Sequence, residues 1–419
     1  MSSALDRCFD VADLRRLARR RLPAPMFHYI DGGSDDEWTL RRNTEAFEDY
    51  ELLPRVLTDI SEIDLSTTLF DTRIGLPFFL APTGMSRLFH HHKEIGVARA
   101  ARAAGTMYSL SALGTTSIED VAAVMGDAPK MFQIYIFRDR GLTRDFVERC
   151  KAARYQALCL TVDTPVAGNR ERDRVTGMTM PPKLTARSLL GFLASPAWSL
   201  NFLRHPDFRI ANVVHRVDAL GREGPMGLID YVNSQFDRSI TWDDAAWLAR
   251  EWGGPLVIKG LSTPDDARRA RSIGASAVMI SNHGGRQLDG SPAALDCLAP
   301  IRDAVGDSLE LIVDGGVRRG THVLKAIALG ANACSIGRAY LYGLAAGGQA
   351  GVERALALLR HELMLDMALL GCRNLREVGP AQVQRASGAR RVPLHPAAAT
   401  EAIDWISRRH APDPIQQVR

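Results

Sequence analysis

Short apolar runs alternate with amphipathic stretches through the middle of the chain. The apolar runs lie at residues 77–81, 107–110, 131–136, 157–162, 255–258, 277–280, 310–313 and 333–336. Stretches of helical period lie between most of them, at residues 94–104, 118–124, 145–153, 264–273, 295–305 and 323–329. Continuous apolar runs are typical of strands buried on both faces, and their alternation with helices indicates a parallel sheet. About eight such units in a row predict an α/β fold, a (β/α)8 barrel of the TIM type.

The segments outside this repeat predict a cap and an insertion. Residues 1–60 contain two helical patterns followed by a loop, and we expect this part to cap the barrel. The helical patterns lie at residues 11–20 and 27–29. Residues 176 to about 239 form an insertion after the fourth strand, too long for an ordinary connection. We expect one barrel domain over residues 1–386 and a tail over residues 387–419 with a short helix at 403–407.

Polar residues or glycines repeatedly follow the predicted strands. They are Pro82, Thr83, Gly84, Ser111, Gln133, Tyr135, Thr161, Asp163, Lys259, Ser281, Asn282, His283, Asp314, Gly315, Gly316, Gly337 and Arg338. In a barrel, the carboxyl ends of all strands lie on one face, where active sites are built. Packing alone would scatter polar residues between the two ends of the strands. The pattern therefore predicts a functional site at this face.

Composition narrows the class of protein further. The 419 residues carry a net charge of only +4, and the basic residues are spread along the chain, so we expect no nucleic-acid partner. The six cysteines contain no CxxC pair, which predicts reduced, buried thiols. The N-terminal region lacks the apolar core of a signal peptide, and no run of about 18 uncharged apolar residues occurs. We expect a cytoplasmic protein without a spanning helix.

The segment at residues 281–289, SNHGGRQLD, has the character of a catalytic loop. His283 follows a predicted strand, and the two glycines after it allow a ligand to approach the backbone closely, which suits a general base. Arg286 can hold a planar carboxylate through two parallel hydrogen bonds. An isolated histidine is most often structural, but the neighbouring glycines and arginine favour a catalytic site here.

Two further segments predict a phosphate site. Residues 314–320 (DGGVRRG) and 336–338 (IGR) follow the seventh and eighth predicted strands. Barrels commonly bind phosphate there through backbone N–H groups and a helix N-terminus. The arginines add complementary charge. Lys259 ends the fifth strand in a chain that uses arginine far more than lysine, which indicates that a compact cation is needed there.

Together these segments resemble the FMN-dependent 2-hydroxy-acid dehydrogenase and oxidase family. The resemblance rests on SNHGGRQLD, DGGVRRG, LTVDTP followed by NRERD at 169–173, FQIY at 132–135 and APTG at 81–84. It covers residues from about 9 to 380, apart mainly from the insertion, and is closest to the membrane-associated L-lactate and mandelate dehydrogenases. It implies FMN as the cofactor and oxidation of an L-2-hydroxy acid, with lactate as the first expectation, to the 2-oxo acid.

The resemblance also implies roles around the substrate. His283 is expected to remove the substrate proton, and Asp163 to orient the histidine ring and stabilise its charged form. The residues that hold the substrate are expected to be Arg286, Arg170 and Tyr29 for the carboxylate and Tyr135 for the hydroxyl. Whether the electrons move as hydride or through a carbanion stays open.

A second set of roles concerns FMN. Lys259 is expected to face the N1/O2 edge of the flavin and to stabilise its reduced anion, which fits a compact positive charge. The expected contacts of the isoalloxazine are Pro82, Thr83, Gly84, Ser111, Gln133 and Thr161. The expected contacts of the ribityl chain and phosphate are Ser281, Asp314, Gly316, Arg318, Gly337 and Arg338.

Three positions depart from the family pattern. Gly84 stands where the oxidases usually carry alanine, which favours a quinone or other carrier over oxygen as the electron acceptor. Leu113 stands where some oxidases have an aromatic residue, which leaves the pocket for the substrate side chain open. The run His90, His91 and His92 replaces part of a more acidic family stretch. Three consecutive histidines are not expected to face one ion, so we predict a surface turn and no metal site.

The insertion contains apolar and aromatic residues near basic ones. These are residues 189–193 (LLGFL) and 198–203 (WSLNFL), with Arg187, Arg204 and His205. The resemblance favours contact of residues 188–205 with a membrane surface, so that the protein would lie on the cytoplasmic face of the inner membrane. A lid over the site or a subunit contact is the alternative. A homo-oligomer, a tetramer, is implied by the resemblance alone.

Other functions remain open at this point. The first is an oxygen-using 2-hydroxy-acid oxidase on the same fold. The second is another FMN barrel enzyme, such as an isomerase, which would not need His283 and Arg286 together. The third is a non-catalytic FMN-binding membrane protein, and the presence of His283, Arg286, Tyr135 and Asp163 argues against it.

Overall fold

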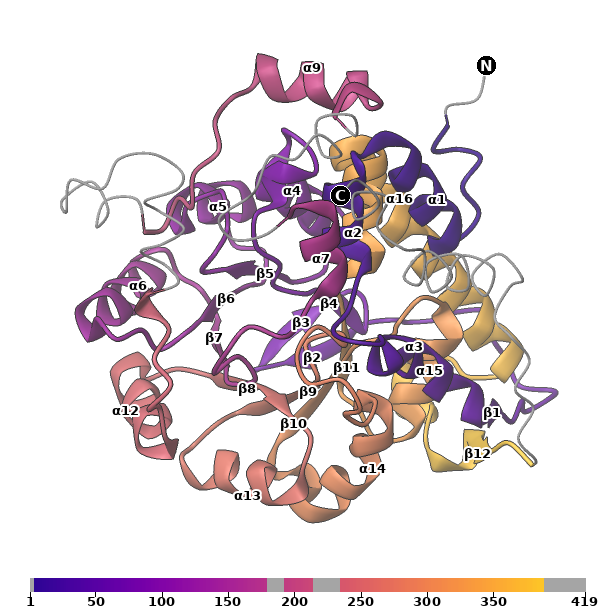
Figure 1. Ribbon diagram of the computed structural model, residues 1–419. Helices are drawn as coiled ribbons and strands as arrows, with labels where there is room; N and C mark the ends of the chain where they lie inside the picture. Colours follow the sequence, from indigo (N-terminus) through magenta and orange to yellow (C-terminus); the bar gives the residue numbers. More distant parts are fainter. Residues whose placement is uncertain (1–3, 179–191, 214–233, 388–419) are drawn as a thin grey trace, which may run out of the picture. The chain divides into compact units, whose positions relative to one another are not determined.

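The computed structural model describes residues 4–178, 192–213 and 234–387 (Figure 1). By its internal contacts the chain separates into two compact units, residues 1–384 and residues 385–419. The helix expected at 403–407, residues 188–191 of the insertion and Arg187 lie outside the described residues.

Eight parallel strands close into a barrel, and this confirms the predicted fold. Around the barrel each strand pairs with the next in the chain, and the last, β11, pairs with the first, β4. The strands are β4 (Phe78–Leu80), β5 (Tyr108–Ser111), β6 (Lys130–Ile134), β7 (Ala157–Thr161), β8 (Leu256–Leu261), β9 (Ala277–Ser281), β10 (Glu310–Asp314) and β11 (Ala333–Ile336). All eight overlap the predicted apolar runs.

Helices surround the barrel in Figure 1. They are α4 (Lys93–Ala103), α5 (Ile118–Met125), α6 (Arg140–Ala152), α12 (Trp242–Trp252), α13 (Pro264–Ser272), α14 (Ala294–Val305), α15 (Gly320–Ala328) and α16 (Arg338–Leu370). The pattern predicted all of these except α12 and α16. A capping box marks the start of α12. The side chain of Thr241 accepts a backbone N–H group of the first turn, and the side chain of Asp244 accepts the backbone N–H of Thr241.

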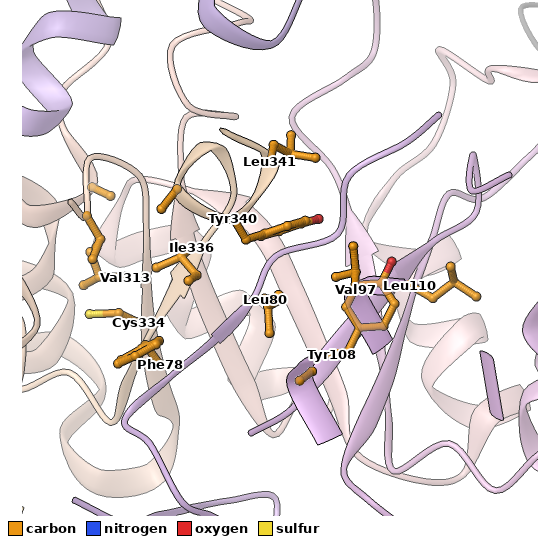
Figure 2. Packing of buried hydrophobic residues seen from close by; sticks show 14 of the residues in the cluster. Phe78, Leu80, Val97, Tyr108, Leu110, Val313, Cys334, Ile336, Tyr340 and Leu341 are labelled. Atoms are coloured by element: carbon orange, nitrogen blue, oxygen red, sulfur yellow. The ribbon is translucent and has the colours of Figure 1, made fainter. Parts of the chain in front are cut away.

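The strand residues alternate between an inner and an outer layer. Residues such as Phe79, Cys159, Val257 and Met279 form an apolar cluster separate from the main core, as expected for the barrel interior. The residues that alternate with them belong to the main core with the helices. Figure 2 shows this packing for Phe78 and Leu80 of β4, Cys334 and Ile336 of β11, and Tyr340 and Leu341 of α16.

Polar side chains replace the apolar ones in the last inward layer. Two residues after Cys159, Val257 and Met279 along their strands come Thr161, Lys259 and Ser281. Because side chains repeat with period two along a strand, these residues also face the interior, at the carboxyl ends of the strands. Strand register places them side by side: Thr161 is paired with Lys259, Asp314 with Ser281, and Ser111 with Gln133. The site is built on this layer.

The N-terminal segment is more structured than predicted. Helices α1 (Val11–Arg21) and α2 (Ala24–Asp31) contain the two predicted helical patterns. The prediction of a loop after these two helices is wrong over residues 38–52. These residues form α3 (Trp38–Glu45), η1 (Ala46–Asp49) and β1 (Tyr50–Leu52). The carboxylate of Asp289 accepts the backbone N–H groups of Trp38 and Thr39 at 3.2 and 2.8 Å. This cap comes from a residue distant in the sequence, which a local pattern cannot reveal.

The remaining elements are short. They are β2 (Thr67–Leu69), β3 (Thr72–Ile74), η2 (Ser86–Leu88), α7 (Glu171–Thr176), α9 (Pro196–Arg204), η3 (Gly306–Ser308), η4 (Leu375–Glu377), η5 (Pro380–Gln382) and β12 (Val383–Arg385). Among the described residues, no helix combines the length and apolar character needed to cross a membrane. All six cysteines are free and buried, which confirms the expectation for the thiols.

A buried charge network holds the N-terminal segment. The carboxylate of Asp31 accepts hydrogen bonds from Arg15 at 2.6 and 2.9 Å, from Arg172 at 3.1 Å and from the Tyr342 hydroxyl at 2.8 Å. Burial alone would raise the pKa of Asp31, but Arg15 and Arg172 hold it well below the usual value. The segment that carries Tyr29 is therefore fixed by ion pairs from α1 and α7 and by a hydrogen bond from the barrel helix α16.

Substitution Asp31→Asn should lower the free energy of unfolding by about 3 kcal/mol at neutral pH, because it removes the buried carboxylate that pairs with the half-buried Arg15 and leaves Arg172 with Glu37 alone. Urea unfolding followed by circular dichroism measures this. A carboxyl group with a lowered pKa stabilises the fold above its unfolded-state pKa of about 3.9, and this stabilisation disappears as the pH falls through the folded-state value. The difference between variant and wild type should therefore shrink below about pH 4.

The matched control for that experiment is Glu148→Gln, which removes an exposed ion pair with Lys151 on α6. It should cost less than about 1 kcal/mol. Equal losses in the two variants would contradict a structural role for the buried network.

Candidate active site

One cavity of about 900 Å³ lies at the carboxyl ends of the barrel strands. Most of the strand-end residues singled out from the sequence lie on its wall. These are Tyr29, Pro82, Thr83, Gly84, Ser111, Gln133, Tyr135, Thr161, Arg170, Lys259, His283, Arg286, Asp314, Gly316, Arg318, Gly337 and Arg338. Two predicted site residues, Asp163 and Ser281, are not on the wall, and each contacts a residue that is.

Asp163 lies behind His283. The Nδ1 atom of His283 is 2.9 Å from the Oδ1 atom of Asp163. Donation from Nδ1 to the carboxylate leaves Nε2 of the neutral ring without a proton, able to accept one. Burial would raise the pKa of Asp163, but the hydrogen bond from His283 and the charge of Lys259 hold it below its usual value. The carboxylate thus stays charged and orients the imidazole.

The backbone around this pair is unusual in two places. His283 itself has a φ of +58°, in the left-handed region that few residues other than glycine adopt. Gly260 has a φ of +107° at an irregularity in β8, and a Cβ there would lie 2.6 Å from the Cβ of Asp163. Such conformations concentrate at functional sites, where the surrounding structure maintains them. Glycine at 260 is what lets the carboxylate approach the strand.

A second buried pair lies beside the first. The Nζ atom of Lys259 is 3.1 Å from the Asp314 carboxylate and donates to the Ser281 hydroxyl at 2.9 Å. That hydroxyl donates to Asp314 at 2.7 Å and accepts the backbone N–H of His283 at 3.0 Å. Burial alone would lower the pKa of Lys259, but Asp314 and Asp163 raise it above its usual value. Lys259 is therefore a permanent positive charge on the cavity wall.

Two arginines and two tyrosines form another part of the wall. The guanidinium groups of Arg286 and Arg170 lie over the Tyr29 ring, 4.8 and 5.6 Å from its centre. Burial and the charge of Arg170 lower the pKa of Arg286 to about 10, so it remains charged at neutral pH. Burial also raises the pKa of the Tyr135 hydroxyl, which stays protonated and able to donate. This combination suits a small anion that also carries a hydroxyl or carbonyl oxygen.

Arg286 has a structural contact in addition. It donates to the carbonyl oxygen of Tyr29 at 2.6 Å and to that of Gly32 at 3.2 Å. These carbonyls belong to the end of α2, where backbone oxygens have no partner within the helix. The carboxylate of Asp173 lies 3.6 Å from the guanidinium Nε of Arg170 on this part of the wall. The sequence did not predict Asp173 as a site residue.

The phosphate region is rich in glycine and arginine. Gly316 has a φ of +77°, and the backbone of Asn43 packs where a side chain would stand. Arg338 donates to the carbonyls of Ile30, Gly32 and Gly284, all at 2.8 Å. The Arg318 guanidinium donates to the carbonyl of Val317, and no carboxylate in the described part of the chain lies within ion-pair distance of it. A half-buried arginine of this kind, just before the start of α15, suits a phosphate group.

Several buried polar atoms on the wall fit a bound flavin. The Nε2 atom of Gln133 and the Oγ1 atom of Thr161 have no hydrogen-bond partner among the described residues, although both are fully buried. Buried polar groups in folded proteins almost always find a partner, so an absent one indicates a ligand or solvent. The amide and hydroxyl match the polar edge of an isoalloxazine. The residues present therefore fit FMN.

Sequence reasoning missed part of this wall. Ser335, on β11, has an unpartnered buried hydroxyl on the cavity wall, and period two from Ala333 would have indicated it. Met178, Ile210 and Phe236 also line the cavity. They come from the insertion, where no periodic pattern indicated which residues return to the barrel.

The prediction that three consecutive histidines cannot converge is wrong. One ring nitrogen from each of His90, His91 and His92 lies within 4.8 Å of the others. The turn before α4 is half-buried, because the insertion packs on it: the His205 ring stacks on His91 at 4.4 Å and Asn201 bonds His91 at 2.7 Å. The Nδ1 atoms of His90 and His92 accept backbone N–H groups, so their neutral rings carry the proton on Nε2. The cluster joins α9 to the barrel.

Comparison with known proteins points to one family. Residues 18–385 match the model of a family described as FMN-dependent dehydrogenase. An L-lactate dehydrogenase of Caulobacter vibrioides is 44% identical over 369 residues, which is 87% of this chain and 95% of that protein. An L-lactate oxidase of Nostoc is 42% identical over 379 residues, 90% of this chain and 98% of that protein.

A solved structure, described as the monotopic membrane protein (S)-mandelate dehydrogenase, has a similar fold. The TM-score is 0.87 at 34% identity, and the match covers 91% of this chain and all (100%) of that one. The family match over residues 18–385 includes every residue of the cavity wall.

Proposed function

Since the chain belongs to the FMN-dependent dehydrogenase family, we propose that it oxidises a small L-2-hydroxy acid, lactate first, to the 2-oxo acid and passes the electrons to a quinone or another carrier. The observation that carries this proposal is the pairing of His283 with Asp163 beside the arginines Arg286 and Arg170 on one cavity wall. A base next to a carboxylate-binding pair is what removal of a proton from a 2-hydroxy acid requires. The chemistry is assigned to the domain of residues 1–386.

The chain's own residues account for the steps at the substrate. Arg286 and Arg170, with Tyr29, bind the carboxylate and fix the orientation of the molecule, which reduces the entropic part of the barrier. Nε2 of His283 takes the substrate proton, and the carboxylate of Asp163 stabilises the imidazolium that forms. The Tyr135 hydroxyl donates a hydrogen bond to the substrate oxygen.

The remaining wall residues hold FMN, which when bound accepts the two electrons of the oxidation. Lys259 places its positive charge where negative charge develops during the reaction. The isoalloxazine contacts are Pro82, Thr83, Gly84, Ser111, Gln133 and Thr161. The residues that would contact the ribityl chain and phosphate are Asp314, Gly316, Arg318, Gly337 and Arg338, with Ser281 proposed beside them through its contacts with Lys259 and Asp314.

The proposal is tested by mixing the purified yellow protein anaerobically with L-2-hydroxy acids and following the flavin absorbance. Wild type should bleach with lactate. The variant His283→Gln should keep its flavin spectrum but bleach at least about 100-fold more slowly, because a general base contributes that much or more. The exposed His361→Gln on α16 is the control and should bleach like wild type.

Unchanged reduction in His283→Gln would remove the base assignment. A yellow wild-type protein that bleaches with no 2-hydroxy acid would instead favour one of the alternatives, another FMN barrel enzyme or a non-catalytic FMN-binding protein.

The electron acceptor is inferred from Gly84. A Cβ at this position would lie 3.1 Å from the Cβ of Leu113, so the wall is fitted to glycine. The reduced wild-type enzyme should be reoxidised by a soluble quinone and only slowly by air. Gly84→Ala, which restores the residue typical of the oxidases, should raise the rate with oxygen several-fold in rapid mixing. Fast reoxidation of the wild type by air would make the protein an oxidase.

Membrane contact is proposed for the described part of the insertion segment 188–205. The side chains of Leu193, Leu200 and Leu203 are 76%, 48% and 75% exposed, and no residue of α9 is buried. Leu200 and Leu203 are three positions apart and share a face of α9. The proposed location is the cytoplasmic face of the inner membrane, and a homo-oligomer, a tetramer, is proposed from the family resemblance.

Replacing both Leu200 and Leu203 with aspartate should move the protein from the pellet to the supernatant when it is sedimented with phospholipid vesicles, because apolar contact with the bilayer is lost. Leu57→Asp, at an exposed leucine outside the insertion, is the control and should still sediment. If wild type stays in the supernatant, the insertion is a lid or a subunit contact.

A further inference from the structure

The loop after β7 carries two residues of the proposed function, Asp163 at its start and Arg170 at its end. No helix or strand lies between them, so regular secondary structure does not fix the distance from one to the other. An irregular segment keeps a single conformation only where its backbone polar groups find partners elsewhere. The partners of this loop therefore determine how the two side chains are placed.

The side chain of Gln287 supplies three of these partners. Its Nε2 atom donates to the carbonyl oxygens of Asp163 and Val166, both at 2.8 Å. Its Oε1 atom accepts the backbone N–H of Gly168 at 3.0 Å. The opposite orientation of the amide would place an oxygen against two carbonyl oxygens, so the partners select this one. One half-buried side chain thus spans the loop from residue 163 to residue 168.

Close packing at Gly168 holds the loop against the same backbone. A Cβ at Gly168 would lie 2.2 Å from the carbonyl oxygen of Arg286 and 2.9 Å from the Cα of Gln287, so only glycine allows this approach. The N–H of Arg170 donates to the carbonyl of Gly168 at 3.0 Å. The position of Arg170 therefore follows from that of Gly168.

The Arg170 end of the loop has a second attachment. The N–H of Asp35 donates to the carbonyl of Asn169 at 2.9 Å, and the Asn169 amide donates to the Asp35 carboxylate at 2.6 Å. These bonds tie residue 169 to the N-terminal segment. We therefore expect loss of the Gln287 contacts to act more strongly at Asp163 than at Arg170.

We propose that Gln287 is a positioning residue, which holds the loop after β7 so that Asp163 stays aligned with Nδ1 of His283. The same contacts keep Arg170 beside Arg286. The inference rests on the proposed function, in which these groups act on one substrate. Gln287 acts through the loop, and a misplacement of about 1 Å in a reacting group can slow a reaction about 100-fold.

The test compares the full-length, FMN-loaded wild type with Gln287→Met, which keeps the length of the side chain and removes its amide. Water can reach the half-buried loop groups that lose their partner, so the fold should survive. In anaerobic stopped-flow mixing with saturating L-lactate, flavin reduction should slow about tenfold or more. Binding of pyruvate, followed through the flavin spectrum, should weaken by a smaller factor, because the Asn169 attachment remains.

A double-mutant cycle shows whether the effect passes through Asp163. The four proteins are the wild type, Gln287→Met, Asp163→Asn and the double variant. If Gln287 acts by aligning Asp163, adding Gln287→Met to Asp163→Asn should slow reduction by less than about a further twofold. A general structural role would slow reduction by the same factor in both backgrounds.

Two more variants serve as controls. Gln156→Met removes a half-buried glutamine that accepts the backbone N–H of Lys130 at 2.8 Å, at the amino end of β6, and should reduce like wild type. Gln287→Asn keeps the amide on a shorter stem and should lie between wild type and Gln287→Met. It carries the test if the methionine variant folds poorly.

Each result has a separate meaning. A wild-type rate in Gln287→Met, an equal loss in Gln156→Met, or the full additive loss in the double variant would overturn the inference and leave the proposed function intact. If no 2-hydroxy acid reduces the flavin of the wild type, the proposed function is overturned and the inference falls with it.

Discussion

The hydrogen bond between Asp163 and Nδ1 of His283 joins the ends of β7 and β9, and the chemistry of the cavity depends on it. The carboxylate stays charged despite its burial, because His283 and Lys259 lie close. Its presence selects the ring form in which Nε2 is free. The glycine at 260 and the left-handed backbone of His283 are local conformations that this contact requires.

The N-terminal segment is bound to the barrel by the same residues that form the site. Arg286 and Arg338 donate hydrogen bonds to the carbonyl oxygens at the end of α2. The helix dipole also favours a cation at that end. Tyr29 lies at this point of α2. The arginines that are proposed to hold the substrate and the phosphate thus also fix the part of the cavity wall that Tyr29 forms. Stability of the segment and geometry of the site are coupled through them.

The insertion has two kinds of surface. Residues at its ends, such as Met178, Ile210 and Phe236, return to the cavity wall. Between them, α9 exposes leucines and is joined to the barrel through the His91 and His205 rings and through Trp198, which donates to the carbonyl of Leu88 at 2.9 Å. One segment therefore contributes both to the cavity and to an apolar outer face. The lid and the membrane contact, which the sequence presented as alternatives, are compatible in this arrangement.

The barrel and the polar layer at its carboxyl ends could be predicted from the amino-acid sequence, because both follow from local periodicity: apolar runs give strands, and period two places Thr161, Lys259 and Asp314 inward. Tertiary structure decided what depends on residues distant in the chain. The cap that Asp289 provides for α3 and the return of Phe236 to Tyr135 leave no local signal. The same holds for the contacts of the His91 ring with Asn201 and His205 of the insertion. Such contacts depend on which surfaces meet once the barrel has closed, and no spacing within one segment encodes that.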